Sequence, residues 1–82
     1  MKKVKIYIKP RCGFCKKALM VLRRHGVNPN IIDVTNNPTK RQEARQYGGT
    51  VPQILFDDEL IGGCDNLVKL EKNGTLDERL GK

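Results

Sequence analysis

The chain has 82 residues, of which 38% are hydrophobic, so we expect one small globular domain with a modest core over residues 1–82. Its sixteen basic and nine acidic residues give a net charge of +7, which favours anionic partners. Because the chain has only two tyrosines, two phenylalanines and no tryptophan, we expect no nucleic-acid binding, and because no long apolar run occurs we expect no membrane association.

The first half of the chain predicts two strand–helix units. Apolar residues alternate from Val4 to Ile8, which indicates a strand ended by Pro10. Helical spacing follows from residue 14 and stops at Gly26. Residues 31–34 predict a second strand, and Asn36-Asn37-Pro38 starts a second helix that runs to about residue 47. Because a helix separates the two strands, they should be parallel with a right-handed crossover.

The second half predicts a hairpin followed by helices. Residues 52–56 and 60–61 predict two strands joined at Asp57-Asp58, which are antiparallel because the connection is short. Asp65 is the expected N-cap of a helix that ends at Asn73-Gly74. Thr75 and Glu78 match a capping box for a last short helix. The predicted fold class is therefore α/β, with a four-stranded mixed sheet flanked by helices.

Three cysteines occur, at positions 12, 15 and 64. An odd number of cysteines argues against a structural disulfide framework. Lys5 and Lys9 interrupt the apolar start of the chain, so it does not resemble a secretion signal. We therefore expect reactive thiols in a cytoplasmic protein.

The Cys12-Gly13-Phe14-Cys15 motif lies where a strand gives way to a helix. Two cysteines three residues apart in a first helical turn can form a small disulfide ring. The free N–H groups and dipole at the helix start stabilise a thiolate on Cys12, so we expect Cys12 to attack and Cys15 to resolve. The alternatives are a zinc half-site, for which only Cys64 and His25 remain as further ligands, or two buried structural cysteines.

Two further motifs carry weaker signals. Thr50-Val51-Pro52 stands at the start of a predicted strand, and by itself it indicates an ordinary proline at a strand start. Gly62-Gly63-Cys64-Asp65 opens a helix and offers either a backbone anion site or a plain glycine turn. Cys64 by itself is expected to be a buried small residue.

The three motifs together, in this order and spacing, resemble the glutaredoxins over nearly the whole chain. The resemblance implies a thioredoxin fold with a cis peptide before Pro52. It also implies a glutathione-dependent oxidoreductase, with Cys12 as nucleophile and Cys15 as resolving thiol. The implied partners are glutathione and proteins carrying glutathione mixed disulfides or disulfides. A monomer and a potential of roughly −200 to −230 mV are expected.

The resemblance also implies a glutathione groove. Lys9, with Arg41 or Gln42, would meet the glycyl carboxylate, Val51 the cysteinyl backbone, and Cys64 with Asp65 the γ-glutamyl end. The full set implied for glutathione is Lys9, Phe14, Arg41, Gln42, Thr50, Val51, Pro52, Gly63, Cys64 and Asp65. Phe14 stands where the family usually has tyrosine, whose hydroxyl contact would be lost.

The Gly-Phe pair inside the motif resembles the Cys-Gly-Phe-Ser monothiol glutaredoxins, which are associated with iron–sulfur clusters. Only Pro10 and Arg11 separate Lys9 from Cys12, as in the dithiol class. The first alternative function is therefore a carrier dimer that shares a [2Fe–2S] cluster through Cys12 and glutathione, with no other metal ligand expected. Two further alternatives are a thioredoxin-like reductant served by a flavoprotein reductase and a non-catalytic basic binding module.

Overall fold

The computed structural model describes all residues from 1 to 82. The elements follow in the order β1 (Val4–Ile8), α1 (Gly13–Arg24), β2 (Asn30–Asp33), α2 (Pro38–Arg45), β3 (Gln53–Phe56), β4 (Glu59–Gly62), α3 (Cys64–Lys72) and α4 (Leu76–Arg79). The strands form one sheet in the order β2-β1-β3-β4. β1 and β2 are parallel, and β3 is antiparallel to both β1 and β4. The predicted element order and mixed sheet are confirmed.

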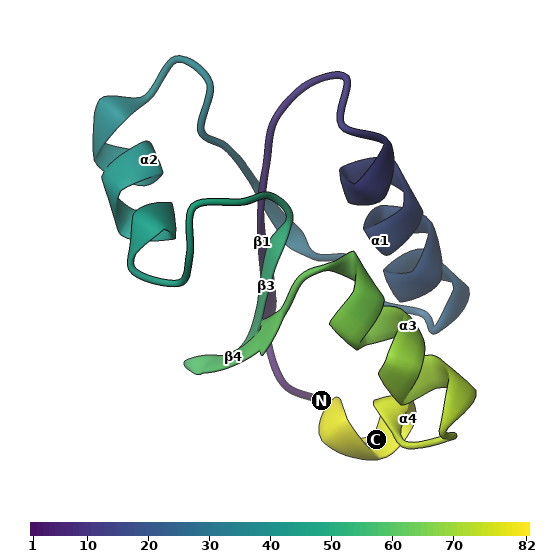
Figure 1. Cartoon of the computed structure of the whole chain (residues 1–82). Coiled ribbons are helices and arrows are strands. Elements are labelled where there is room, and N and C mark those ends of the chain that lie inside the picture. Colours follow the sequence, from purple (N-terminus) through teal and green to yellow (C-terminus); the bar gives the residue numbers. More distant parts are fainter.

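The sheet lies between α1 and α3 on one face and α2 on the other (Figure 1). Because strand side chains alternate between faces, neighbouring residues of β1 enter different layers. Ile6 packs with Phe56 and Leu22 in the larger core cluster, which α1, α3 and α4 cover. Tyr7 packs with Ala44 in the smaller cluster under α2. Three layers built in this way constitute the thioredoxin-type arrangement that the sequence predicts.

One predicted helix cap is wrong, and a second has the predicted residue without its capping hydrogen bond. The N-cap of α3 is Gly63, so Asp65 lies inside the first turn, where its charge suits the positive end of the helix dipole. Thr75 is the N-cap of α4, but its hydroxyl donates to the carbonyl oxygen of Leu70 instead of accepting from the last helix. The predicted start of α2 is confirmed, because the Asn37 side chain accepts from the N–H of Lys40.

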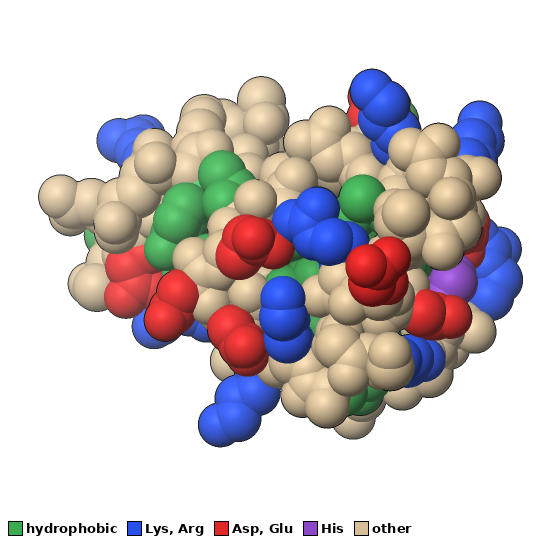
Figure 2. Space-filling view, turned by 90° about the horizontal axis from the view of Figure 1, so that it is seen from below, with side chains coloured by type: hydrophobic (Ala, Val, Ile, Leu, Met, Phe, Trp, Pro, Cys, Tyr) green, Lys and Arg blue, Asp and Glu red, His purple; other side chains and the backbone are tan.

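The end of the molecule that carries α4 and the β3–β4 turn has acidic and basic side chains intermixed on its surface (Figure 2). His25, at the end of α1, lies in this region between two carboxylates. Its Nδ1 is 2.9 Å from Asp77 Oδ1, and its Nε2 is 2.7 Å from Glu71 Oε2. Arg24 also contacts Glu71, at 2.8 Å. This cluster ties the C-terminal end of α1 to α3 and α4.

The His25 cluster predicts a pH-dependent stability. Hydrogen bonds to Asp77 raise the pKa of His25, while Arg24 first and His25 second lower the pKa of Glu71. A histidine whose pKa is higher in the folded than in the unfolded protein stabilises the fold when it is protonated. This contribution is complete below the unfolded pKa of about 6.5 and disappears as pH rises through the folded pKa. The lowered glutamate pKa acts in the opposite sense, and its contribution is lost on acidification below about pH 4.5.

We therefore expect the wild type to lose about 1 kcal/mol of unfolding free energy between about pH 6 and pH 8.5, and His25→Gln to lack this dependence. Thermal unfolding followed by circular dichroism across that range measures the effect. His25 is the only histidine, so no other imidazole contributes. Lys69→Gln, an exposed substitution on α3, is the matched control. Parallel pH profiles for wild type and His25→Gln would contradict the prediction.

Candidate active site

The thiol of Cys12 lies at the start of α1. Cys12 is the N-cap of the helix, and its Sγ accepts a hydrogen bond from the N–H of Cys15 at 3.2 Å. The preceding residue, Arg11, has a φ of 59°, in the left-handed region, and so turns the chain into the helix. The helix dipole and the donated N–H both favour negative charge on this sulfur. Cys12 is half-buried, so the sulfur remains accessible.

The second thiol of the motif lies behind the first. Cys15 is only 2% exposed. Burial raises the pKa of the Cys15 thiol to about 12, and the contact with Cys12 adds to this shift. Cys15 is therefore protonated while Cys12 presents the accessible sulfur. The two cysteines therefore differ in accessibility, with Cys12 half-buried and Cys15 fully buried.

The Thr50-Val51-Pro52 loop faces these thiols. The Val51–Pro52 peptide bond is cis, as the resemblance implies. The buried Gln53 braces the loop, because its Nε2 donates to the carbonyl oxygen of Thr50 at 2.9 Å. The Cys12 Sγ lies 4.0 Å from the carbonyl oxygen of Val51. The loop thus places backbone groups directly beside the reactive sulfur.

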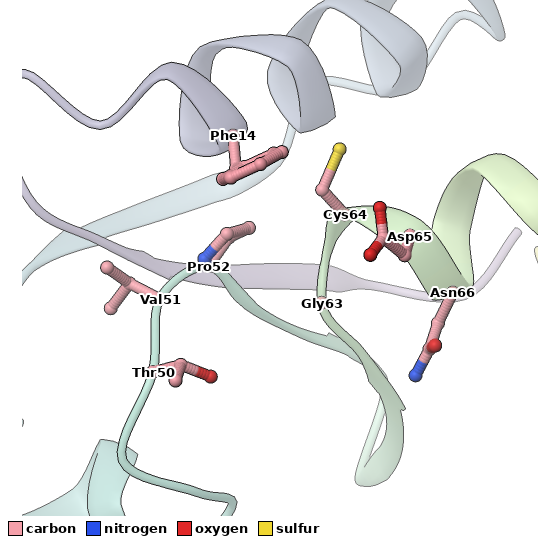
Figure 3. A pocket seen from close by; sticks show the side chains of 8 residues that line it. All are labelled: Phe14, Thr50, Val51, Pro52, Gly63, Cys64, Asp65 and Asn66. Carbon is pink, nitrogen blue, oxygen red and sulfur yellow. The ribbon is translucent and has the colours of Figure 1, made fainter.

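A cavity of about 220 Å³ opens next to this loop (Figure 3). Phe14 borders it from α1, and the start of α3 contributes Cys64, Asp65 and Asn66. The Asp65 carboxylate reaches toward the cavity, whereas the Cys64 sulfur points toward α1 (Figure 3). Asp65 is its only acidic lining residue, so this end of the site is negatively charged.

A second cavity, of about 80 Å³, lies on the other side of the same loop, and both cavities are lined by Thr50 and Val51. Its charged lining residues are Lys9, Arg41 and Arg45, without any acidic group. The two cavities, which we call the groove, thus have a carboxylate on one side of the loop and cations on the other. Cys12 lines neither cavity, but its Sγ lies 4.0 Å from the carbonyl oxygen of Val51, a residue that lines both.

The structure brings together nine of the ten residues that the resemblance assigns to glutathione. Phe14, Thr50, Val51, Pro52, Gly63, Cys64 and Asp65 line the larger cavity, and Lys9 and Arg41 line the smaller one. Gln42 does not reach the groove; it borders a neighbouring depression on the outer side of α2. The helical repeat explains this, because residue 42 points about 100° away from residue 41, whereas residue 45 returns to the same face.

Sequence reasoning missed two residues of this region. Arg45 lines the cationic cavity, and its spacing of four from Arg41 could have identified it. Asn66 donates from Nδ2 to the carbonyl oxygen of Ile61 at 3.1 Å, across Gly62. Gly62 has a φ of 117°, which side chains rarely adopt, and a Cβ there would displace the Asn66 amide, so this turn before α3 favours glycine.

Cys64 is buried, as predicted, with 4% of its surface exposed. Burial raises the pKa of its thiol; the positive charge of Lys17 opposes the shift, and the negative charge of Asp65 adds to it. A protonated, buried thiol is a poor nucleophile. Cys64 therefore contributes to the wall of the groove and not to its reactive centre.

None of the helices is long and apolar enough to cross a bilayer.

Comparison with known proteins identifies several relatives. The glutaredoxin family model matches residues 4–61. Glutaredoxin 3 of Escherichia coli is 40% identical over 82 residues, which cover 98% of this chain and 99% of the relative. Monothiol glutaredoxin-S11 of rice is 39% identical over 75 residues, but the match spans only 15% of that longer protein.

Solved structures agree with these sequence matches. The solution structure of a glutaredoxin from Brucella melitensis has a TM-score of 0.85 at 38% identity and covers 100% of this chain and 94% of that one. A buckwheat glutaredoxin, solved as a glutathione complex, has the same fold, with a TM-score of 0.86 at 21% identity over 98% of this chain and 77% of that one. The family match, the relatives and the Cys12–Cys15 geometry agree, and the chain therefore belongs to the glutaredoxin family of glutathione-dependent thiol–disulfide oxidoreductases.

Proposed function

We propose that this protein reduces mixed disulfides between glutathione and other thiols, with Cys12 as the nucleophile. The observation that carries the proposal is the position of the Cys12 sulfur. It accepts the N–H of Cys15 at the start of α1 and lies beside Val51, the residue on whose two sides the carboxylate and the cations of the groove are found. Free glutathione carries an ammonium group and a carboxylate at one end and a single carboxylate at the other, so its charges match this polarity.

The bound orientation follows from these charges. The γ-glutamyl ammonium pairs with Asp65, and the γ-glutamyl carboxylate meets the N–H groups at the start of α3. The glycyl carboxylate lies against Lys9 and Arg41. The backbone of Val51 pairs with the cysteinyl residue between them, which brings the glutathione sulfur to Cys12.

The reaction then proceeds by two thiol–disulfide exchanges. The Cys12 thiolate attacks the glutathione sulfur of the mixed disulfide, a new S–S bond forms, and the other thiol leaves as a thiolate that takes up a proton. A second glutathione thiolate attacks the Cys12-bound glutathione sulfur. Glutathione disulfide leaves, and the Cys12 thiolate is restored. Glutathione supplies both electrons.

Protein disulfides follow a second route in which Cys15 resolves the intermediate. Cys12 forms a mixed disulfide with one substrate sulfur, and Cys15, after losing its proton, attacks Cys12 and releases the substrate as a dithiol. The product is the Cys12–Cys15 disulfide, which glutathione reduces. Because the Cys15 thiol is buried, this route needs the additional deprotonation step.

Asp65→Asn tests the orientation of glutathione. Removing the carboxylate deletes a charge-assisted hydrogen bond to the γ-glutamyl ammonium, so we expect KM for a glutathione mixed disulfide to rise about tenfold with kcat little changed. The assay couples glutathione disulfide formation to glutathione reductase. Asp58→Asn is the matched control, because Asp58 lies in the β3–β4 turn and borders a different depression. An unchanged KM in Asp65→Asn would refute the orientation, whereas an inactive wild type would refute the proposed function.

A single copy of this protein has too few accessible thiols to bind an iron–sulfur cluster by itself. Such clusters take four thiolate ligands, and Cys12 is the accessible thiol of this chain, since Cys15 and Cys64 are buried. A cluster would therefore need the Cys12 thiols of two chains and two glutathione thiols, as the carrier alternative assumes, and no observation in this chain favours that alternative. The proposed reaction starts from a free Cys12 thiol, so it implies a reducing compartment such as the cytoplasm.

A further inference from the structure

The cationic end of the groove holds more positive charge than glutathione can neutralise. Three cationic side chains, Lys9, Arg41 and Arg45, line the small cavity. Arg41 and Arg45 continue from it along the outer side of α2, where they border a depression of about 420 Å³ together with Pro38 and Gln42. The single glycyl carboxylate of glutathione brings only one negative charge to this region.

No acidic side chain of the protein offsets this excess. Lys9, Arg41 and Arg45 take part in no ion pair within 4.0 Å. Glu43, on the same helix, is held by Lys40 at 3.2 Å. Asp33, at the end of β2, accepts the N–H of Thr35 at 2.8 Å. Neither of these carboxylates forms an ion pair with Lys9, Arg41 or Arg45.

The two arginines differ in how they are held. The guanidinium of Arg41 donates to the carbonyl oxygens of Val34 and Thr35, which fixes its position without neutralising its charge. Arg45 is exposed, and unlike Arg41 its side chain forms no hydrogen bond with the protein. The two lie four residues apart on one helix face, where like charges repel each other. A second anion at this place would relieve that repulsion.

We propose that this end of the groove selects γ-glutamylcysteinyl thiols whose third residue carries a second carboxylate, and that Arg45 is the specificity-determining residue. The proposal rests on the proposed function, because it assumes that the third residue of the ligand points toward Lys9 and Arg41. The first carboxylate takes the place of the glycyl carboxylate. The second reaches Arg45 at the border of the outer depression.

Binding of three unreactive S-methyl peptides tests the proposal. They are γ-Glu-Cys-Gly, γ-Glu-Cys-Asp and γ-Glu-Cys-Gly-amide, titrated into the reduced wild-type protein at low salt and followed by NMR. We expect the Asp peptide to bind about fivefold more tightly than the Gly peptide, as an exposed ion pair permits. The amide, which lacks the first carboxylate, should bind more weakly than either. The preference for Asp should shrink in high salt, because the charges are exposed.

Arg45→Gln should remove the difference between the Asp and Gly peptides. Arg23→Gln is the matched control, because it loses the same charge from an exposed position in the last turn of α1, and it should keep the preference. Equal dissociation constants for the two peptides in the wild type, or a preference that persists in Arg45→Gln, would overturn the proposal. If the amide binds as well as the Gly peptide, the assumed orientation itself is wrong, and with it the proposed groove. A separate assay of mixed-disulfide reduction by the wild type then shows whether the proposed function still holds when the proposed binding orientation does not.

Discussion

Cys12→Ser is expected to abolish the reduction of glutathione mixed disulfides, with a fall in kcat/KM of about a thousandfold or more. A serine hydroxyl stays protonated at neutral pH and cannot form the disulfide intermediate. It can still accept the N–H of Cys15, so the start of α1 should be preserved. The measurement is the glutathione reductase-coupled assay with a small mixed disulfide as substrate.

Cys15→Ser is the companion variant in the same assay. The one-cysteine route uses only Cys12 and glutathione, so most activity toward the small mixed disulfide should survive in Cys15→Ser. Reduction of a protein disulfide should fall strongly, because no second thiol remains to resolve the intermediate. Substantial activity in Cys12→Ser would show that another thiol attacks. A wild type without activity would instead favour the iron–sulfur carrier reading, which anaerobic cluster reconstitution would then test.

The second large effect is the pH dependence of the resolving step. Burial is the main cause that raises the pKa of the Cys15 thiol to about 12, and this cause persists when Cys12 is bound to glutathione. Because burial is the largest cause, we expect the pKa of Cys15 to stay raised in that adduct even without the contribution from the Cys12 thiol. Only the thiolate attacks, and its fraction rises tenfold per pH unit below the pKa. We therefore expect the resolving rate to rise about tenfold per unit between about pH 6 and pH 8.

Single-turnover kinetics isolate this step. The reduced protein is mixed with glutathione disulfide, quenched with acid at intervals, and the Cys12–glutathione adduct is followed by mass spectrometry. The adduct should decay to the internal disulfide at a rate that depends on pH in the wild type. In Cys15→Ser, under the same conditions, it should persist. A decay rate independent of pH over this range would show that Cys15 is already ionised, contrary to its burial.

The local sequence was sufficient to predict the elements and the reactive motif. Alternation from Val4 to Ile8 and the stops at Pro10 and Gly26 are short-range signals, because backbone propensity and capping depend on neighbouring residues. The parallel pairing of β1 and β2 also follows from chain order alone. The position of the Cys12 sulfur at the start of α1 also follows from the local sequence. Cys12 and Cys15 are three residues apart, within one helical turn.

Helix ends were less predictable, because more than one residue competes for each cap. Asp65 and Thr75 are good capping residues, yet Gly63 caps α3 and the Thr75 hydroxyl turns back to Leu70. The entry of the chain from β4 decides which residue occupies the cap position. The path of the chain from β4 into α3 depends on packing between elements far apart in the sequence, so a local sequence pattern does not predict it.

Only the tertiary structure decided which side chains share the groove. The sequence left Arg41 and Gln42 as alternatives, and the orientation of α2 on the sheet directs Arg41 and Arg45 toward Val51 and turns Gln42 away. The burial of Cys15, and hence its raised pKa, likewise comes from packing over the start of α1 and not from the motif. Local patterns thus determined the elements and the reactive thiol. The charge polarity of the groove and the protonation of its second thiol arise from contacts between segments distant in the chain.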